Sequence, residues 1–159
     1  MRIVLLLFIT TLFLAGCDDD RVFEQITDLD NRQWLVSEKP EFEFVIDNIG
    51  AQYNLYCDIR NSVSYPYSRF FFTYYLQDSS GTEIKRALMT EFLFDAKTGK
   101  PFGKSGIGDL YDHRFLMVKN HQFKYKGKYR VKFEQFMRTD TLAGVLAVGL
   151  RVERSRPGK

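Results

Sequence analysis

Large apolar and aromatic residues alternate with polar ones along much of this chain from Phe42 onward. An alternation with a period of two places every second side chain on the same face of an extended strand, and so predicts half-buried β-strands. It is clearest over residues 129–133 and 148–152. The predicted inward-facing rows are Phe42, Phe44 and Ile46; Tyr53, Leu55, Cys57 and Ile59; Phe70, Phe72, Tyr74 and Leu76; Tyr129, Val131 and Phe133; and Val148, Leu150 and Val152.

Turn-forming residues separate these predicted strands at positions 47–50, 78–81 and 126–128. The mixed segment 82–94 is expected to add a strand, and no window in the rest of the domain keeps a helical period. About seven or eight strands without crossover helices favour one all-β domain, an antiparallel β-sandwich of immunoglobulin-like or jelly-roll type. We expect this domain to span residues 31–159.

The first residues of the chain form a different pattern. Arg2 is followed by a charge-free, largely apolar run over residues 3–14 and by two small residues before Cys17. The apolar run is shorter than the roughly 20 residues of a membrane-spanning helix, and the order of parts is that of a cleaved signal. Residues 1–16 are therefore predicted to be a lipoprotein signal peptide, cleaved ahead of a lipidated Cys17. Two or more acyl chains would hold the protein firmly at a membrane.

Three aspartates, residues 18–20, directly follow Cys17. Because carboxylates pack neither into a bilayer nor into a protein core, residues 17–30 are predicted to form a tether between the lipid and the domain. The acidic run is equally consistent with a plain solvated linker and with a sorting signal.

Charge and cysteine content narrow the classes of function. The chain has 23 basic and 20 acidic residues of interspersed sign, which offers no electrostatic footprint for nucleic acid. Once Cys17 is lipidated, Cys57 is the one remaining cysteine, so no intramolecular disulfide is expected. Cys57 alternates in phase with Leu55 and Ile59, which predicts a small buried side chain rather than a reactive thiol.

Catalytic and ligand-binding patterns are weak. Residues 99–105 resemble a phosphate-binding loop, but three residues instead of four separate the two glycines, so we expect no nucleotide. Asp95, Asp109 and Asp112 could offer oxygens to Ca²⁺, but they lack EF-hand spacing and are better interpreted as surface carboxylates. The two histidines have no ligand spacing, and no serine lies in a Gly-x-Ser-x-Gly motif. We expect no enzymatic activity, no cofactor and no metal ion.

Two segments are candidate contact surfaces. The densest aromatic stretch, residues 65–75, either fills the core or faces outward as a binding patch. The glycine-rich segment 95–112 has no predicted structure over its eighteen residues, and long loops of this kind are often functional. The candidate partner-contact residues are Tyr65, Tyr67, Phe71, Tyr75, Asp109 and Tyr111.

An ordered set of short motifs runs from Cys17 to about residue 153. It comprises Asn54-Leu55-Tyr56, Ile59-Arg60-Asn61, Tyr65-Pro66-Tyr67-Ser68, the segment 106–112, Gly127-Lys128-Tyr129, Glu134-Gln135, Met137-Arg138, Leu142-Ala143-Gly144-Val145 and the segment 148–153. Together with the lipoprotein signal, this set resembles the gliding motility lipoprotein GldH family of the Bacteroidota. The resemblance implies a small, non-enzymatic envelope lipoprotein that serves surface gliding alongside type IX secretion components and other Gld lipoproteins. It carries over one functional position, Cys17.

Two hypotheses follow. The first is a binding or scaffolding component of gliding motility or type IX secretion-associated machinery, anchored through Cys17 in the cell envelope. Its expected location is the outer membrane, on the periplasmic or the surface face, and its expected partners are other gliding or secretion lipoproteins or envelope proteins. The alternative is a glycan-binding module of a surface nutrient-capture system, in which the tyrosine-rich stretch would stack on sugar rings.

Overall fold

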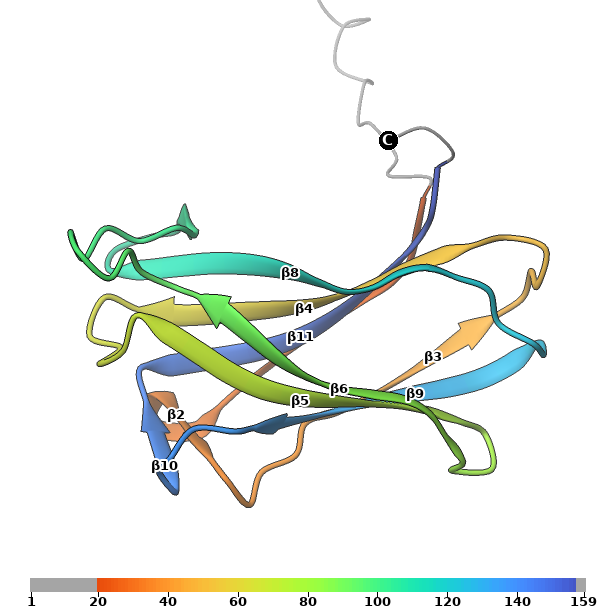
Figure 1. Cartoon of the computed structure of the whole chain (residues 1–159), viewed down its shortest axis with the longest axis horizontal. Coiled ribbons are helices and arrows are strands. Elements are labelled where there is room, and N and C mark those ends of the chain that lie inside the picture. The colour runs from red at the N-terminus through yellow and green to blue at the C-terminus, as the bar shows by residue number, and fades with distance from the viewer. Residues whose placement is uncertain (1–19, 157–159) are drawn as a thin grey trace, which may run out of the picture.

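The computed structural model describes residues 20–156, which form two antiparallel β-sheets packed face to face (Figure 1). The elements are β1 (Arg21–Asp28), the 3-10 turn η1 (Asp30–Arg32), β2 (Gln33–Leu35), β3 (Glu41–Ile46), β4 (Tyr53–Ser62), β5 (Arg69–Asp78), β6 (Glu83–Phe92), β7 (Lys104–Ser105), β8 (Leu110–His121), β9 (Gly127–Gln135), β10 (Thr141–Ala143) and β11 (Val145–Arg154). One sheet has the order β1-β11-β4-β8-β7 and the other β3-β9-β5-β6, while β2 and β10 form a small sheet at one end.

The long strands pair as in a single hairpin that has been rolled up. Its innermost pair is β5 with β6, followed outward by β4 with β8, β3 with β9 and β1 with β11, all antiparallel. Successive pairs lie in opposite sheets, which is the arrangement of an eight-stranded jelly roll. The predicted antiparallel sandwich is confirmed, and of its two versions the pairing selects the jelly roll over the immunoglobulin-like type.

The core lies between the sheets and contains the rows that the alternation predicts, all of them buried. Aromatic rings interlock across it: the rings of Phe42 and Phe133 meet edge-on with 5.9 Å between centroids. Trp34 of β2 closes one end of the core beside Phe70. Cys57 is fully buried, as predicted, and burial raises the pKa of its thiol well above the ordinary value.

Strand β1 differs from the sequence prediction. The sequence predicts a tether over residues 17–30, but residues 21–28 pair with residues 147–153 of β11 and belong to the sheet. This part of the tether prediction, and the domain boundary at residue 31, are wrong. An edge strand with mostly exposed side chains needs no apolar row, because its main-chain hydrogen bonds to β11 hold it in place. Val22 and Phe23 pack against the core, and the ring of Phe23 meets that of Phe44 at 6.1 Å between centroids. The predicted signal peptide and the predicted lipidation site, Cys17, lie outside the described residues.

The segment 95–112 is also more ordered than the sequence predicts. It folds back along β8: β7 pairs with residues 111–112, and Phe94 forms a β-bridge with Pro101. A carboxylate oxygen of Asp95 accepts the main-chain N–H of Thr98 at 2.7 Å and closes the intervening turn. The predicted turns at 47–50 and 78–81 and the predicted strand within 82–94 are confirmed.

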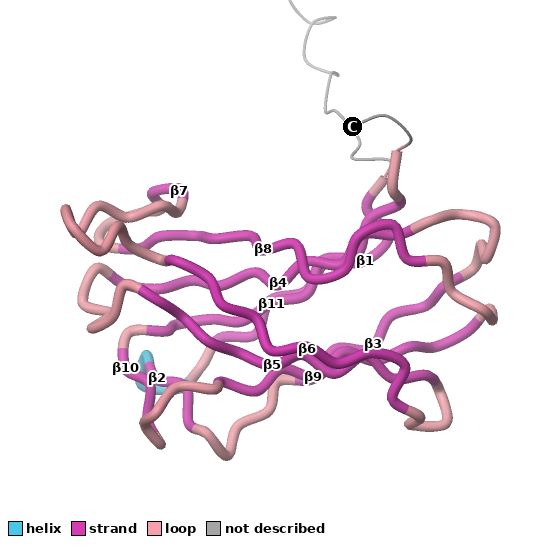
Figure 2. The backbone as a smooth tube through the Cα atoms, viewed as in Figure 1, coloured by secondary structure: helices cyan, strands magenta, loops and turns pink. Residues whose placement is uncertain are grey.

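Because the strands are antiparallel, the loops gather at two ends of the sandwich (Figure 2). We call the end where β1 begins and β11 ends the proximal end; it also carries loops 47–52, 79–82 and 122–126. The opposite, distal end carries loops 29–40, 63–68, 93–109 and 136–144. Over residues 20–156, no helix is long and apolar enough to cross a membrane.

Candidate interaction surface

Exposed apolar side chains gather on the outer face of the β3-β9-β5-β6 sheet, toward its distal end. Strand β5 contributes Phe71, the neighbouring edge strand β6 contributes Leu88, and the loop before β5 contributes Tyr67. Phe136 and Met137 follow the end of β9. These side chains, with Arg138 at the rim, surround a groove of about 470 Å³, which we call the distal groove.

Main-chain geometry holds the groove in shape. Because Phe70 and Phe72 point into the core, the intervening Phe71 points outward. The N–H of Phe136 donates to the main-chain oxygen of Phe71 at 2.8 Å. The N–H of Phe71 in turn contacts the sulfur of Met137 at 3.4 Å. The segment after β9 is therefore fixed against β5, leaving the Leu88 and Phe136 side chains 52% and 60% exposed. Clusters of exposed apolar side chains are typical of protein contact sites.

The groove adjoins an open sheet edge. Among the described strands, β6 pairs with β5 alone, so its other side presents free main-chain N–H and C=O groups. Ile84, Leu88 and Phe92 are the exposed apolar residues of this strand. An extended peptide can add to such an edge by main-chain hydrogen bonds, and the positive charges of Lys85 and Arg86 discourage indiscriminate pairing. Leu88 belongs to both the edge and the groove.

Beyond the groove, the same outer face is charged. The Tyr75 hydroxyl donates to a Glu134 carboxylate oxygen at 2.5 Å, and this bond raises the pKa of the phenol. The Lys132 ammonium lies 5.1 Å from the centre of the Tyr75 ring and the Arg86 guanidinium 5.8 Å from it. Tyr75, predicted from the sequence as a contact residue, therefore lies outside the groove and is covered by charged side chains.

Tyr65, another predicted contact residue, is in the core. Its hydroxyl donates to the main-chain oxygen of Arg69 at 2.9 Å, its ring stacks on Phe94, and burial raises its pKa. The expectation that it faces a partner is wrong for a physical reason. The N–H of Tyr65 donates to the oxygen of Ser62, and this turn ends the strand alternation and directs the ring inward. Tyr67, two residues later, remains exposed.

The other two predicted contact residues lie near the start of β8, apart from the groove. Asp109 is exposed, and its main-chain oxygen accepts the N–H of Val63 at 2.8 Å. Tyr111 is half-buried, with its ring edge-on to Phe94. Neither residue lines the distal groove. Both residues lie at the distal end of the sandwich.

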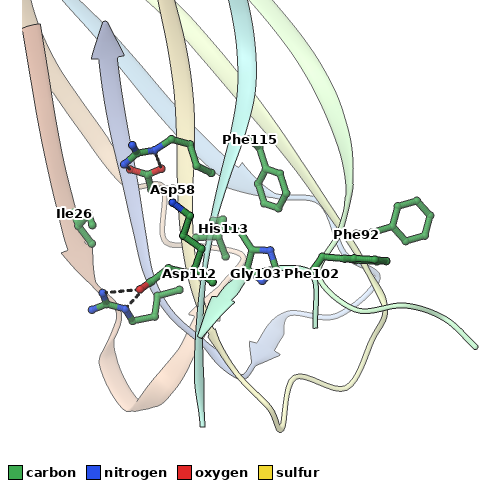
Figure 3. A pocket seen from close by; sticks show the side chains of 12 residues that line it. Ile26, Asp58, Phe92, Phe102, Gly103, Asp112, His113 and Phe115 are labelled. Atoms are coloured by element: carbon green, nitrogen blue, oxygen red, sulfur yellow. Dashed lines mark hydrogen bonds and ion pairs between the residues drawn. The ribbon is translucent and has the colours of Figure 1, made fainter. Parts of the chain in front are cut away.

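A second cavity of about 470 Å³ lies along β8 (Figure 3). Its walls include the rings of Phe102, His113 and Phe115. His113 is buried, and its Nε2 has no hydrogen-bond partner among the described residues. Gly103 packs so tightly against this ring that a Cβ there would come within 2.6 Å of Nε2. Burial lowers the pKa of His113 to about 4, so its ring is neutral at pH 7.

The carboxylates of this cavity are engaged by arginines. Asp112 accepts the Arg60 Nε–H at 2.8 Å, and Asp58 accepts the Arg114 Nε–H at 2.7 Å. Neither carboxylate is therefore free to act as a base beside His113. No cluster of three or more His, Cys, Asp or Glu side chains among residues 20–156 is placed to hold a metal ion.

Sequence reasoning missed much of the groove: Leu88, Phe136, Met137 and Arg138 were outside its candidate set. The phase of the alternation in β9 could have identified Phe136 as an outward-facing residue. The inward row of β9 continues from Phe133 to the buried Gln135, so an apolar Phe136 is out of phase with the core. Leu88 carried no such signal, because its strand has apolar residues on both faces.

Comparison with known proteins agrees with the motifs. The family model for the GldH lipoprotein matches residues 21–152. Relatives include a gliding motility lipoprotein GldH homolog of Christiangramia forsetii (29% identical; 96% of this chain and 95% of the relative). Another is the gliding motility lipoprotein GldH of Flavobacterium johnsoniae (24% identical; 94% of each chain). Among solved structures, the VP2 subviral particle of infectious bursal disease virus matches with a TM-score of 0.39 and 12% identity, over 86% of this chain and 33% of the viral chain. The chain belongs to the GldH lipoprotein family.

Proposed function

We propose that this protein is a non-enzymatic binding component of the gliding motility machinery, which binds an envelope protein through the distal groove. Lipid on Cys17 holds it in the outer membrane. Support for the setting comes from the family, whose relatives are named gliding motility lipoproteins. Support for a non-enzymatic role comes from the β8 cavity, where a neutral His113 has no activating carboxylate.

The observation that carries the binding role is the junction of the distal groove with the open edge of β6. A partner segment in extended conformation would pair with the main chain of β6. Its apolar side chains would pack beside Leu88 and reach across β6 toward Phe71, and an acidic residue flanking the paired segment would lie on the Arg138 side of the groove. The partner chemistry is therefore an extended, apolar segment with a flanking acidic residue.

The experiment replaces one groove residue at a time in the full-length protein in cells of the source bacterium. Leu88→Asp and Phe136→Asp each put a charge in the groove. Val45→Asp is the matched control, because Val45 is 55% exposed on β3, the other edge strand of the same sheet. Chemical cross-linking and co-purification then measure which envelope proteins are recovered.

Burying an unpaired charge in a contact core costs about 3 kcal/mol, so we expect recovery of the partner to fall by more than about tenfold for both groove variants. The Val45→Asp variant should recover the partner at the level of the unmodified protein. Equal recovery by all three variants would refute the groove as the binding site. Melting temperatures within a few degrees of one another would show that all three variants are folded.

The glycan-binding alternative needs several exposed rings to stack on sugar faces. In the tyrosine-rich stretch, Tyr65 is buried and Tyr75 is covered by Arg86 and Lys132, which leaves Tyr67 as its exposed tyrosine. This arrangement favours protein binding. A glycan array probed with the unmodified protein would detect the alternative.

A further inference from the structure

We infer that the proximal end of the sandwich lies against the bilayer that holds the lipid anchor. Tyr125 would lie at the level of the lipid headgroups, and the lysines beside it in the loop and at the end of β8 would face their phosphates. This inference rests on the proposed lipid anchor at Cys17. It adds an orientation: the proximal end faces the membrane and the distal groove faces away from it.

The chain between Cys17 and β1 is too short to reach far from the proximal end. Arg21, where β1 begins, is the fourth residue after Cys17, and an extended chain covers at most about 3.6 Å per residue, or about 14 Å over these four steps. Arg21 is opposite Glu153, and the N–H of Arg154 donates to the oxygen of Asp20 at 2.7 Å, so this point is fixed at the proximal end. A ten-residue strand such as β4 is about 33 Å long, which exceeds that reach. The anchor can therefore bring the proximal end, and not the distal groove, to the membrane.

Two proximal loops, 47–52 and 122–126, carry exposed side chains that suit a membrane surface. Tyr125 is 69% exposed and is the most exposed aromatic side chain of the described residues, and Ile49 is also exposed. Lys119, Lys124 and Lys126 flank them and have no ion-pair partner within residues 20–156. Tyrosine prefers the headgroup region of a bilayer, and lysines near the surface are attracted to anionic lipids.

Hydrogen bonds hold these two loops in place. The Tyr129 hydroxyl donates to the main-chain oxygen of Tyr125 at 2.8 Å and accepts its N–H at 3.2 Å. The side chain of Gln122 donates to the main-chain oxygen of Ile49 at 3.0 Å, which joins the two loops. The Tyr125 ring is thus presented outward by a fixed backbone, so binding a surface would cost little conformational entropy.

Acidic groups at this end are partly neutralised. Asp47 lies 3.7 Å from the Arg154 guanidinium, and Asp20 forms an ion pair with Arg156. The three lysines, whose ammonium groups have no ion-pair partner within residues 20–156, are the cations that would face the lipid phosphates. A planar bilayer with anionic lipids is the occupant that a tyrosine, an isoleucine and unpaired lysines at one end would suit.

The experiment measures depth in the bilayer with the mature, lipidated protein in vesicles of phosphatidylethanolamine and phosphatidylglycerol that contain nitroxide-labelled lipids. Tyr125→Trp places a fluorophore at the proximal end. Tyr67→Trp is the matched control, an exposed tyrosine at the distal end. The chain's one native tryptophan, Trp34, is buried and adds the same background to both.

We expect the nitroxide lipids to quench the emission of Tyr125→Trp at least twofold more than that of Tyr67→Trp. Equal quenching of the two, or none at position 125, would overturn the inference. Replacing phosphatidylglycerol by phosphatidylcholine should lower the quenching, and unchanged quenching would refute the role of the lysines. Flotation with the vesicles and fatty-acid labelling that Cys17→Ser abolishes report on the anchor itself. Protein that fails these two tests refutes the proposed anchor, whereas protein that floats without quenching refutes the orientation alone.

Discussion

The buried His113 predicts a specific loss of stability in mild acid. Its ring lies parallel to that of Phe115, with 5.6 Å between centroids, and its Nε2 is buried without a hydrogen-bond partner among the described residues. Burial lowers the pKa from the ordinary 6.5 to about 4, because a charged imidazolium would be poorly solvated there, and the nearby Asp112 only partly opposes this effect.

The sign and size follow from proton linkage. Between pH 6.5 and 4, the unfolded chain binds a proton at His113 that the folded protein does not, so acidification favours unfolding. The stabilisation that neutral His113 gives to the folded protein is fully present above pH 6.5, and the free energy of unfolding falls as the pH decreases toward 4. At pH 5 the loss amounts to about 2 kcal/mol, at 1.36 kcal/mol for each pKa unit.

The assay is urea unfolding of the Cys17→Ser protein, purified without lipid, at pH 7 and at pH 5. The comparison is with the same protein carrying His113→Gln, whose side chain does not titrate in this range. We expect the His113 protein to lose about 2 kcal/mol more than the variant between the two pH values. His121→Gln is the control, because burial and Lys85 lower the pKa of His121 as well. This variant measures how much His121 contributes to the pH dependence of the free energy of unfolding. Identical pH dependence with and without His113 would refute the reasoning.

Two further predictions concern buried positions. Gly144 has a φ of 82°, and a Cβ there would come within 2.7 Å of the Tyr65 Cα, so Gly144→Ala should lower the free energy of unfolding by about 3 kcal/mol. Gly81 has the same φ of 82° but open space around it, so Gly81→Ala should cost only about 1 kcal/mol in urea unfolding, and equal losses would contradict the contact argument. The buried thiol of Cys57, whose pKa is raised, should not react with a thiol reagent in the folded Cys17→Ser protein but should react in urea; rapid labelling without urea would show that the site opens.

Two features of the candidate site could not be predicted from the sequence. Tyr65 and Tyr67 are two residues apart, and strand periodicity would put both on one face, but the chain leaves the strand at the turn after Ser62, so one ring is buried and the other exposed. Phe136 and Leu88 are about fifty residues apart and form one groove only because β5 lies between β9 and β6 in the sheet. No local sequence pattern predicts that these two side chains lie side by side.

The fold class and the family could both be predicted from the amino-acid sequence. Period-two alternation forces one face of each strand out of water, so the alternation alone identifies the inward rows of β3, β4, β5, β9 and β11. Ordered motifs, which are local, identified the GldH lipoprotein family. Three features required the folded structure: the nested pairing that makes a jelly roll, the incorporation of β1 by main-chain hydrogen bonds, and the groove beside β6. Alternation indicates which face of a strand is buried, whereas the choice of neighbouring strand depends on contacts between residues far apart in the chain.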